Sequence, residues 1–459
     1  MRCRKTLQAV AVSLSVFVAP VAATAETMAD ALVLAYRHSG LLEQNRALLR
    51  AADENVAVAL SATRAAVSYS IGATLDYTPD FFSSGFIASG GATASISAQL
   101  TIFDFGANQL AIDVAKETVL ATRETLVSVE QEVMRRAIVA YLTVLRNSAF
   151  VDLREANVQL IARELDASRE RFDVGEITRT DVSLAESHLA AARSDLAAAQ
   201  GDLLVAREEY RAATGQYPGT LQAPSSLPNV PASLQEARAI ALRRHPAIRQ
   251  AQRQVTVTEL NIERAIAAMK PKLTGSYRYT LNQDWDRSTQ LALSFGGSLY
   301  QGGRLSALYR QAQANRDAQR AALHITRHDV EQSAGDAWSG LTVANASLLA
   351  SQEQVRASTL ALRGVQEEAS LGARTTLDVL DAEQELLNAR TNEISAGTQR
   401  TVAIYSLLTS LGLLTAEHLN LGITTYDPAA YYNAVRNAPT YEVSPQGDQL
   451  DRVLRALNR

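Results

Sequence analysis

Two histidines, His324 and His328, come closest in this sequence to a pair of side chains that could bind a metal ion. Residues four apart lie on one face of a helix, so both imidazoles could reach the same ion. Protein zinc sites use three or four ligands, and no third ligand is indicated nearby. A solvated helix face is the simpler explanation. The sequence also has no nucleophile motif, phosphate-binding loop or metal-binding cluster, so it predicts neither an enzyme nor a cofactor.

Two carboxylates, Asp378 and Asp381, are three residues apart and therefore share one face of a helix. They lie in a stretch, residues 372–383, that has an earlier copy at 175–186, and matching residues are 197 positions apart. In both copies a helical pattern stops at a glycine and restarts at Thr-x-x-Asp, which is typical of a glycine C-cap followed by a capping box. Each copy is predicted to be the tip of a helical hairpin. Asp378 has a local role as the capping residue, whereas Asp381 has Leu184 as its counterpart and no such role.

The chain is predicted to consist of two similar halves, because the copied stretch belongs to a longer repeat. The first repeat covers residues 26–217 and the second covers residues 234–415. A proline-rich linker, residues 218–233, joins them. The last residues, 416–459, form a C-terminal segment that is expected to be partly disordered.

Each half contains two segments in which apolar and polar residues alternate strictly. In the first segment, Tyr69 and Ile71 flank Ser70 in this way. Alternation over about eleven residues is the pattern of a strand that crosses an outer membrane with one face in lipid. A soluble antiparallel sheet with one buried face would show the same alternation. The first half has extra residues, which predict a long external loop from Pro79 to Gly90. The strands are predicted at about 66–78, 91–103, 272–282 and 289–300.

Proline is absent from Asp80 to Tyr217 and from Lys272 to Asp427, which permits very long helices. They are expected at about 105–214 and 304–412, each span turning back at its glycine tip. Roughly 65 residues up to the first tip would make a helix on the order of 100 Å long. Such helices must bury their apolar stripes against one another. The sequence therefore predicts a mainly helical fold with a membrane β-barrel.

Residues 1–25 have the basic start, apolar run and small residues at the end that are typical of a secretory signal peptide. Cys3, the only cysteine, lies inside it, so the mature chain is expected to have no disulfide, thiolate metal site or lipid-anchored cysteine. Removing the signal changes the formal charge from -4 to about -7, which disfavours a nucleic-acid partner. Beyond the signal only Lys116, Lys270 and Lys272 are lysines, and genomic base composition explains this bias more simply than function.

With these features the chain resembles the TolC family of outer-membrane channels over essentially its whole mature length. It is most similar to the branch that serves type I protein secretion, through Asp30-Ala-Leu-Val-Leu-Ala-Tyr36, Arg46-Ala-Leu-Leu-Arg-Ala-Ala-Asp-Glu54, Tyr300-Gln-Gly-Gly303, Gly364-Val-Gln-Glu-Glu-Ala369 and Tyr426-Asp-Pro428. The resemblance implies a homotrimer with a shared twelve-strand barrel in outer-membrane lipid and a twelve-helix periplasmic tunnel. The strand count agrees, because four strands cannot close a membrane barrel and about eight is the minimum.

The resemblance also assigns roles to the tips, which in the family form the periplasmic entrance. Asp378 and Asp381 match the acidic residues that form rings in the pore gate. Arg374 matches an arginine that holds the entrance shut, with Asp181 and Thr180 as its latch partners. A tyrosine that usually supports this latch is replaced here by Ala369, which implies a different closed-state network.

A second role of the tips in the family is contact with a periplasmic adaptor protein. The positions that match the docking surface are Val174, Gly175, Leu371, Gly372 and Arg374. The glycines could also be C-caps, and capping and docking are compatible.

The leading functional hypothesis is an exit duct that works with an adaptor and an inner-membrane ABC exporter in type I protein secretion. An alternative keeps the duct but couples it to a multidrug efflux pump. A third, an exported coiled-coil scaffold without a barrel, is disfavoured by the four amphipathic strands. The expected location is the outer membrane of a Gram-negative bacterium, with the helices in the periplasm.

Overall fold

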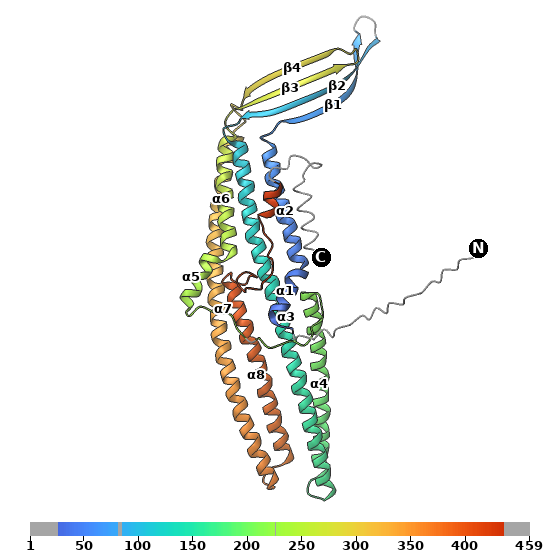
Figure 1. The fold of residues 1–459 in the computed structure, drawn as a ribbon, viewed down its shortest axis with the longest axis vertical. Helices are drawn as coiled ribbons and strands as arrows, with labels where there is room; N and C mark the ends of the chain where they lie inside the picture. Colours follow the sequence, from blue (N-terminus) through green and yellow to red (C-terminus); the bar gives the residue numbers. More distant parts are fainter. Residues whose placement is uncertain (1–25, 81–84, 225, 436–459) are drawn as a thin grey trace, which may run out of the picture.

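The computed structural model describes residues 26–80, 85–224 and 226–435 and shows a long bundle of helices with a four-stranded sheet at one end (Figure 1). The predicted signal peptide and the residues after 435 lie outside the described residues. The elements are α1 (Met28–His38), α2 (Gly40–Ser61), β1 (Ala66–Asp80), β2 (Gly85–Phe103), α3 (Ala107–Asp173), α4 (Arg179–Thr214), α5 (Leu234–Arg244), α6 (Pro246–Ala267), β3 (Lys272–Asn282), β4 (Arg287–Gly296), α7 (Arg304–Ser370), α8 (Thr376–Ser410) and α9 (Ala430–Val435).

Helices α3 and α7 have 67 residues each, so both are on the order of 100 Å long. Each starts after a glycine with positive φ, Gly106 at 85° and Gly303 at 83°, which turns the chain from the sheet into the bundle. Their partners α4 and α8 return antiparallel, and both hairpin tips lie at the end of the molecule opposite the sheet (Figure 1). Among the described residues, no helix is apolar over enough of its length to cross a bilayer.

The sheet is antiparallel with strand order β1-β2-β3-β4. Its register places Tyr69 opposite Ile96 and Ile96 opposite Tyr279, so the apolar residues share one face. Helices of this chain leave that face open: Tyr69 is 82% exposed and Leu291 is 79% exposed. The alternative of a soluble sheet with a buried face therefore lacks a covering layer among the described residues.

The first hairpin corrects the prediction of a long loop from Pro79 to Gly90. The ladder continues beyond the strict alternation, with Thr78 paired to Ile87 and Asp80 paired to Gly85. Backbone hydrogen bonds between antiparallel strands form whatever the side chains are. The two strands therefore continue past the point where the alternation of apolar and polar residues stops. Strand β4 ends at Gly296 rather than near residue 300.

The middle of the bundle holds the main hydrophobic core. Tyr141 of α3 is fully buried, and its hydroxyl lies 2.9 Å from the carbonyl oxygen of Glu26 and 2.6 Å from that of Gln222. The C-terminal segment also packs here, because the Arg46 guanidinium lies 5.1 Å from the Tyr36 ring and 5.4 Å from the Tyr426 ring. Residues 416–435, the described part of the segment that was expected to be partly disordered, are thus fixed to α1 and α2.

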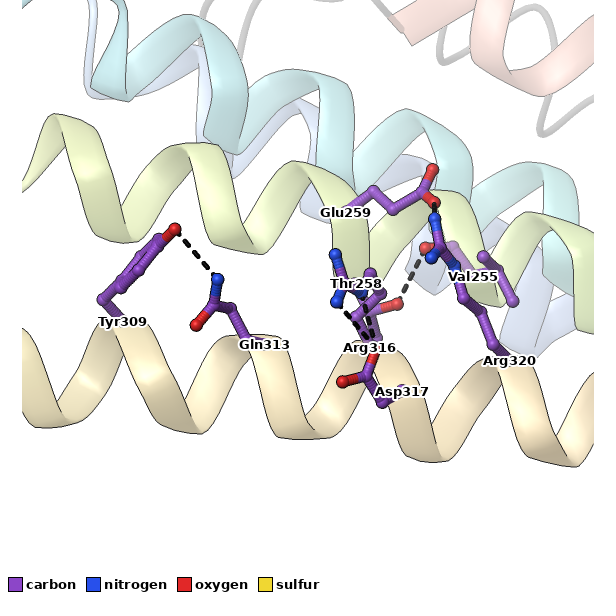
Figure 2. Close-up of polar contacts among 8 residues, drawn as sticks. All are labelled: Val255, Thr258, Glu259, Tyr309, Gln313, Arg316, Asp317 and Arg320. Atoms are coloured by element: carbon purple, nitrogen blue, oxygen red, sulfur yellow. Dashed lines mark hydrogen bonds and ion pairs between the residues drawn. The ribbon is translucent and has the colours of Figure 1, made fainter.

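Polar contacts connect α6 and α7 beside the sheet (Figure 2). The Arg320 guanidinium on α7 donates to a Glu259 carboxylate oxygen on α6 at 2.6 Å, whereas the Gln313 amide and the Tyr309 hydroxyl pair within α7 at 2.9 Å. Between the two hairpins, the contact is made mainly by α8 against α3.

Candidate functional site at the hairpin tips

Both tips are built by the same local signals, as predicted. Gly175 has a φ of +80° and Gly372 a φ of +76°, and a Cβ added to either would meet nothing within 4 Å. The glycines are therefore required by the left-handed backbone of the helix end and not by crowding. After each glycine, Thr178 and Thr375 form the predicted capping boxes and start α4 and α8.

The residues assigned to adaptor docking all lie on the open surface of the tips. Val174 is 73% exposed and Leu371 is 85% exposed, and these two apolar side chains occupy matching positions of the repeat. Gly175, Gly372 and Arg374 are exposed beside them. Apolar residues held at a rigid turn at the end of the molecule suit contact with another protein.

The carboxylates of Asp378 and Asp381 differ in their hydrogen-bond partners. An Asp378 carboxylate oxygen accepts hydrogen bonds from the Thr375 backbone N–H and hydroxyl, both at 2.8 Å. These bonds hold the pKa of Asp378 below its ordinary value. Asp381 is exposed one turn further along and has no hydrogen bond or ion pair within the described ranges.

The predicted latch residues are not brought together within one chain. The Arg374 guanidinium donates to a Glu368 carboxylate oxygen at 2.8 Å, across the turn between α7 and α8. Asp181 accepts from the Thr178 backbone N–H at 2.9 Å in the other tip, and Thr180 is exposed beside it. Within one chain, Arg374 and Asp181 therefore each have a different partner.

Glu383, two residues beyond Asp381 on α8, is a buried carboxyl group that sequence reasoning missed. Its side chain is only 4% exposed, and neither carboxylate oxygen has a well-formed hydrogen bond among the described residues. Burial, and then the neighbouring carboxylate of Glu164 on α3, raise the pKa of Glu383 to about 7. The amide of Gln366 on α7 and the charge of Arg163 on α3 oppose this shift only in part.

The repeat contains a signal that could have revealed Glu383. Its counterpart in the first half, Glu186, is half exposed and accepts a hydrogen bond from Arg169 across the hairpin at 2.9 Å. The residue matching Arg169 in the second half is Gln366, so Glu383 has a neutral amide where Glu186 has a guanidinium partner. Comparing the two copies position by position shows the exchange, although it does not show the burial.

A family model described as "Outer membrane efflux protein" matches residues 32–216 and 238–413, which is most of both repeats. The chain belongs to the outer membrane efflux protein family.

Two relatives in this family show the extent of the similarity. The chain is 34% identical over 425 residues to the outer membrane efflux protein BepC of Brucella suis biovar 1 (strain 1330), covering 91% of this chain and 92% of BepC. It is 26% identical over 374 residues to the outer membrane protein TolC of Escherichia coli (strain K12), covering 76% of this chain and 75% of TolC.

Solved structures of the same kind have the same fold. CusC, solved in work on folding and transmembrane channel formation, superposes with a TM-score of 0.75 at 17% identity, over 84% of this chain and 91% of CusC. VceC of Vibrio cholerae gives a TM-score of 0.72 at 19% identity, over 84% of this chain and 96% of VceC. The predicted TolC-like fold class is confirmed.

Membership in the outer membrane efflux protein family locates the chain in the outer membrane, with its helical part in the periplasm, as an efflux channel of a tripartite system. Channels of this kind form homotrimers and work with adaptors and inner-membrane transporters. They are channels and not enzymes. His324 and His328 are both exposed on α7, and the described residues contain no group of three or more potential metal ligands.

Proposed function

We propose that this chain forms the outer-membrane exit duct of a type I protein secretion system, with a periplasmic adaptor and an inner-membrane ABC exporter. The main support for a role as an exit duct is the pair of matching hairpin tips. Val174 and Leu371 are exposed on the two turns, and Asp381 is exposed near the second turn. The secretion branch is supported by sequence motifs, among them Tyr300-Gln-Gly-Gly303, whose last two glycines have φ of +57° and +83° at the turn into α7.

The proposed assembly is a homotrimer. The apolar face of the sheet is uncovered, and β1 and β4 are edge strands with a free side in the single chain. A bilayer does not tolerate free strand edges, so pairing β4 of one chain with β1 of the next would close a barrel of twelve strands. The paired helices would continue below it as a tunnel ending at the tips.

Multidrug efflux is the second candidate, and one observation favours it. The relative that is 34% identical to this chain, BepC, is named an outer membrane efflux protein. Both candidates use the same duct and differ in the inner-membrane partner.

The test of the proposed function compares the proteins in the culture medium of a deletion strain with those of its parent. Loss of one or a few large secreted proteins, restored by the wild-type gene, is the expected result. An unchanged set of secreted proteins together with increased drug susceptibility would refute the secretion assignment and support efflux.

A substitution of Arg374 can test whether this residue acts by pairing with Glu368 within its own chain or with Asp181 of a neighbouring chain. Arg374→Ser should raise the closed-state conductance in planar bilayers, because it removes the cation that holds neighbouring helices together. Glu368→Gln is the matched control, since it removes the partner of Arg374 within the chain. That ion pair is about half exposed, with both side chains near 50%, so water screens it and its loss alone should change stability little.

If the latch runs between chains, Arg374→Ser will increase the current much more than Glu368→Gln. If both substitutions changed the closed-state conductance by the same small amount, Arg374 would only stabilise the turn between α7 and α8. The latch assignment would then be wrong.

A further inference from the structure

Two of the few lysines of this chain lie on either side of Pro271: Lys270 in the connector between α6 and β3, and Lys272 as the first residue of β3. The connector lies at the end of the sheet that joins the helices, and therefore at the periplasmic end (Figure 1). Strand β3 is an inner strand, paired to β2 and β4, so this connector is away from the free edges where another chain would join.

Lys270 lies beside an aromatic cluster on the apolar face. Phe103 pairs with Leu273, which belongs to the apolar face of β3, and the Phe103 and Phe105 ring centroids are 4.7 Å apart. The Lys270 ammonium lies 5.4 Å from the Phe105 ring centroid. Both rings are substantially exposed, Phe103 at 52% and Phe105 at 40%. An ammonium group held over an exposed aromatic ring at the end of a membrane strand is suited to the boundary between acyl chains and headgroups.

The charge of Lys270 is available to a ligand. Lys270 makes no ion pair within the described ranges, whereas Lys116 in the bundle lies 3.4 Å from an Asp113 oxygen. Asp104, a nearby carboxylate, accepts hydrogen bonds from the backbone N–H groups of Gly106 at 3.0 Å and Asn108 at 2.8 Å. Its charge is thus engaged in starting α3.

The two lysines lie at one end of β3, and two carboxylates with one arginine, Arg287, lie at the other. The far turn between β3 and β4 contains Asp284 and Asp286, whose backbone N–H groups donate to the Asn282 side chain at 3.0 and 2.7 Å. A cationic end on the periplasmic side and an acidic turn on the external side imply that the anionic ligand lies in the periplasmic leaflet.

We propose that Lys270, with Phe103 and Phe105, binds the phosphate groups of anionic phospholipids in the periplasmic leaflet of the outer membrane. The proposal rests on the outer-membrane location of the chain and is independent of what the duct exports. Lys272 provides an internal comparison. As the first residue of β3, it precedes Leu273 and is on the opposite, polar face by alternation, at the same depth.

The test uses the full-length trimer in vesicles of phosphatidylethanolamine and phosphatidylglycerol, with spin-labelled phosphatidylglycerol and spin-labelled phosphatidylcholine as probes. The ratio of their association constants measures the preference for the anionic headgroup. For wild type we expect a preference on the order of fivefold at low salt, which falls as salt is raised. Lys270→Gln should bring the ratio close to one, Lys270→Arg should keep it, and Lys272→Gln should leave it unchanged.

Two results would overturn the proposal. One is an unchanged ratio in Lys270→Gln, with the variant shown to be a folded trimer by heat-modifiable migration. The other is an equal loss in Lys272→Gln, which would mean that general charge at the sheet end is responsible. A separate arm replaces phosphatidylglycerol with lipopolysaccharide, and displacement of the probe from Lys270 by lipopolysaccharide alone would assign the surface to the external glycolipid and also refute the proposal.

Discussion

Replacing Glu383 with glutamine should stabilise the contact between α3 and α8 above pH 7 and remove its dependence on pH. The wild-type carboxyl has a pKa of about 7 in the folded chain against an ordinary value of 4.5. A difference of this size corresponds to roughly 2–3 kcal/mol for a side chain that is 4% exposed. Glutamine keeps the shape and never ionises.

The sign follows from proton binding. The folded state holds the Glu383 proton more tightly than the unfolded state, because burial and Glu164 disfavour the carboxylate. The stabilisation is therefore complete below about pH 4.5, is lost as pH rises toward about 7, and stays lost above it. The Arg163 charge and the Gln366 amide reduce this effect but leave the pKa raised.

Hydrogen exchange of the α8 amides at pH 5 and pH 8, corrected for the intrinsic rates, measures the effect. Wild type should exchange faster at pH 8 by up to about a hundredfold, while Glu383→Gln should be equally protected at both values. Glu186→Gln is the matched control, since the same residue type at the repeat-related position is half exposed and paired with Arg169. We expect it to change protection little. Equal protection of wild-type α8 at both pH values would contradict the prediction.

The acidic rings that the resemblance assigns to Asp378 and Asp381 should make the channel prefer cations, and neutralising Asp381 should reduce that preference. Asp381 is exposed on the same helix face as Asp378 and has no partner among the described residues, so its charge is free to act on ions at the entrance. A unit charge a few ångströms away in water contributes about 0.5–1 kcal/mol, so the loss of three in a trimer should lower the local cation concentration on the order of tenfold. Reversal potentials of single channels under a salt gradient measure this.

The structure decides which substitutions make clean comparisons. Asp378→Ala would remove the capping box as well as a charge, whereas Asp378→Asn keeps an oxygen acceptor for Thr375. Asp181→Asn removes the equivalent capping charge from the other tip. If selectivity depended only on the net charge of the tips, Asp181→Asn and Asp381→Asn would have equal effects. An unchanged reversal potential in Asp381→Asn would show that the selective ring lies elsewhere.

Much of the fold was predictable because its signals are local. The capping boxes at Thr178 and Thr375, and the glycine turns before them, are set by a few adjacent residues, and the structure has them as predicted. Period-two alternation likewise predicted the strands and which residues share the apolar face. The length of the first hairpin was wrong, since backbone pairing to Gly85 does not depend on that alternation.

The candidate site was predictable in position but not in its contacts. The sequence by itself determined the tips, their exposed apolar residues and the face shared by Asp378 and Asp381, because helix periodicity and capping act within a few residues. Only the tertiary structure decided that Arg374 pairs with Glu368 and that Glu383 is buried against α3. Burial and ion pairing depend on which helix lies across the interface, and residues some 200 positions apart carry no local signal of that contact.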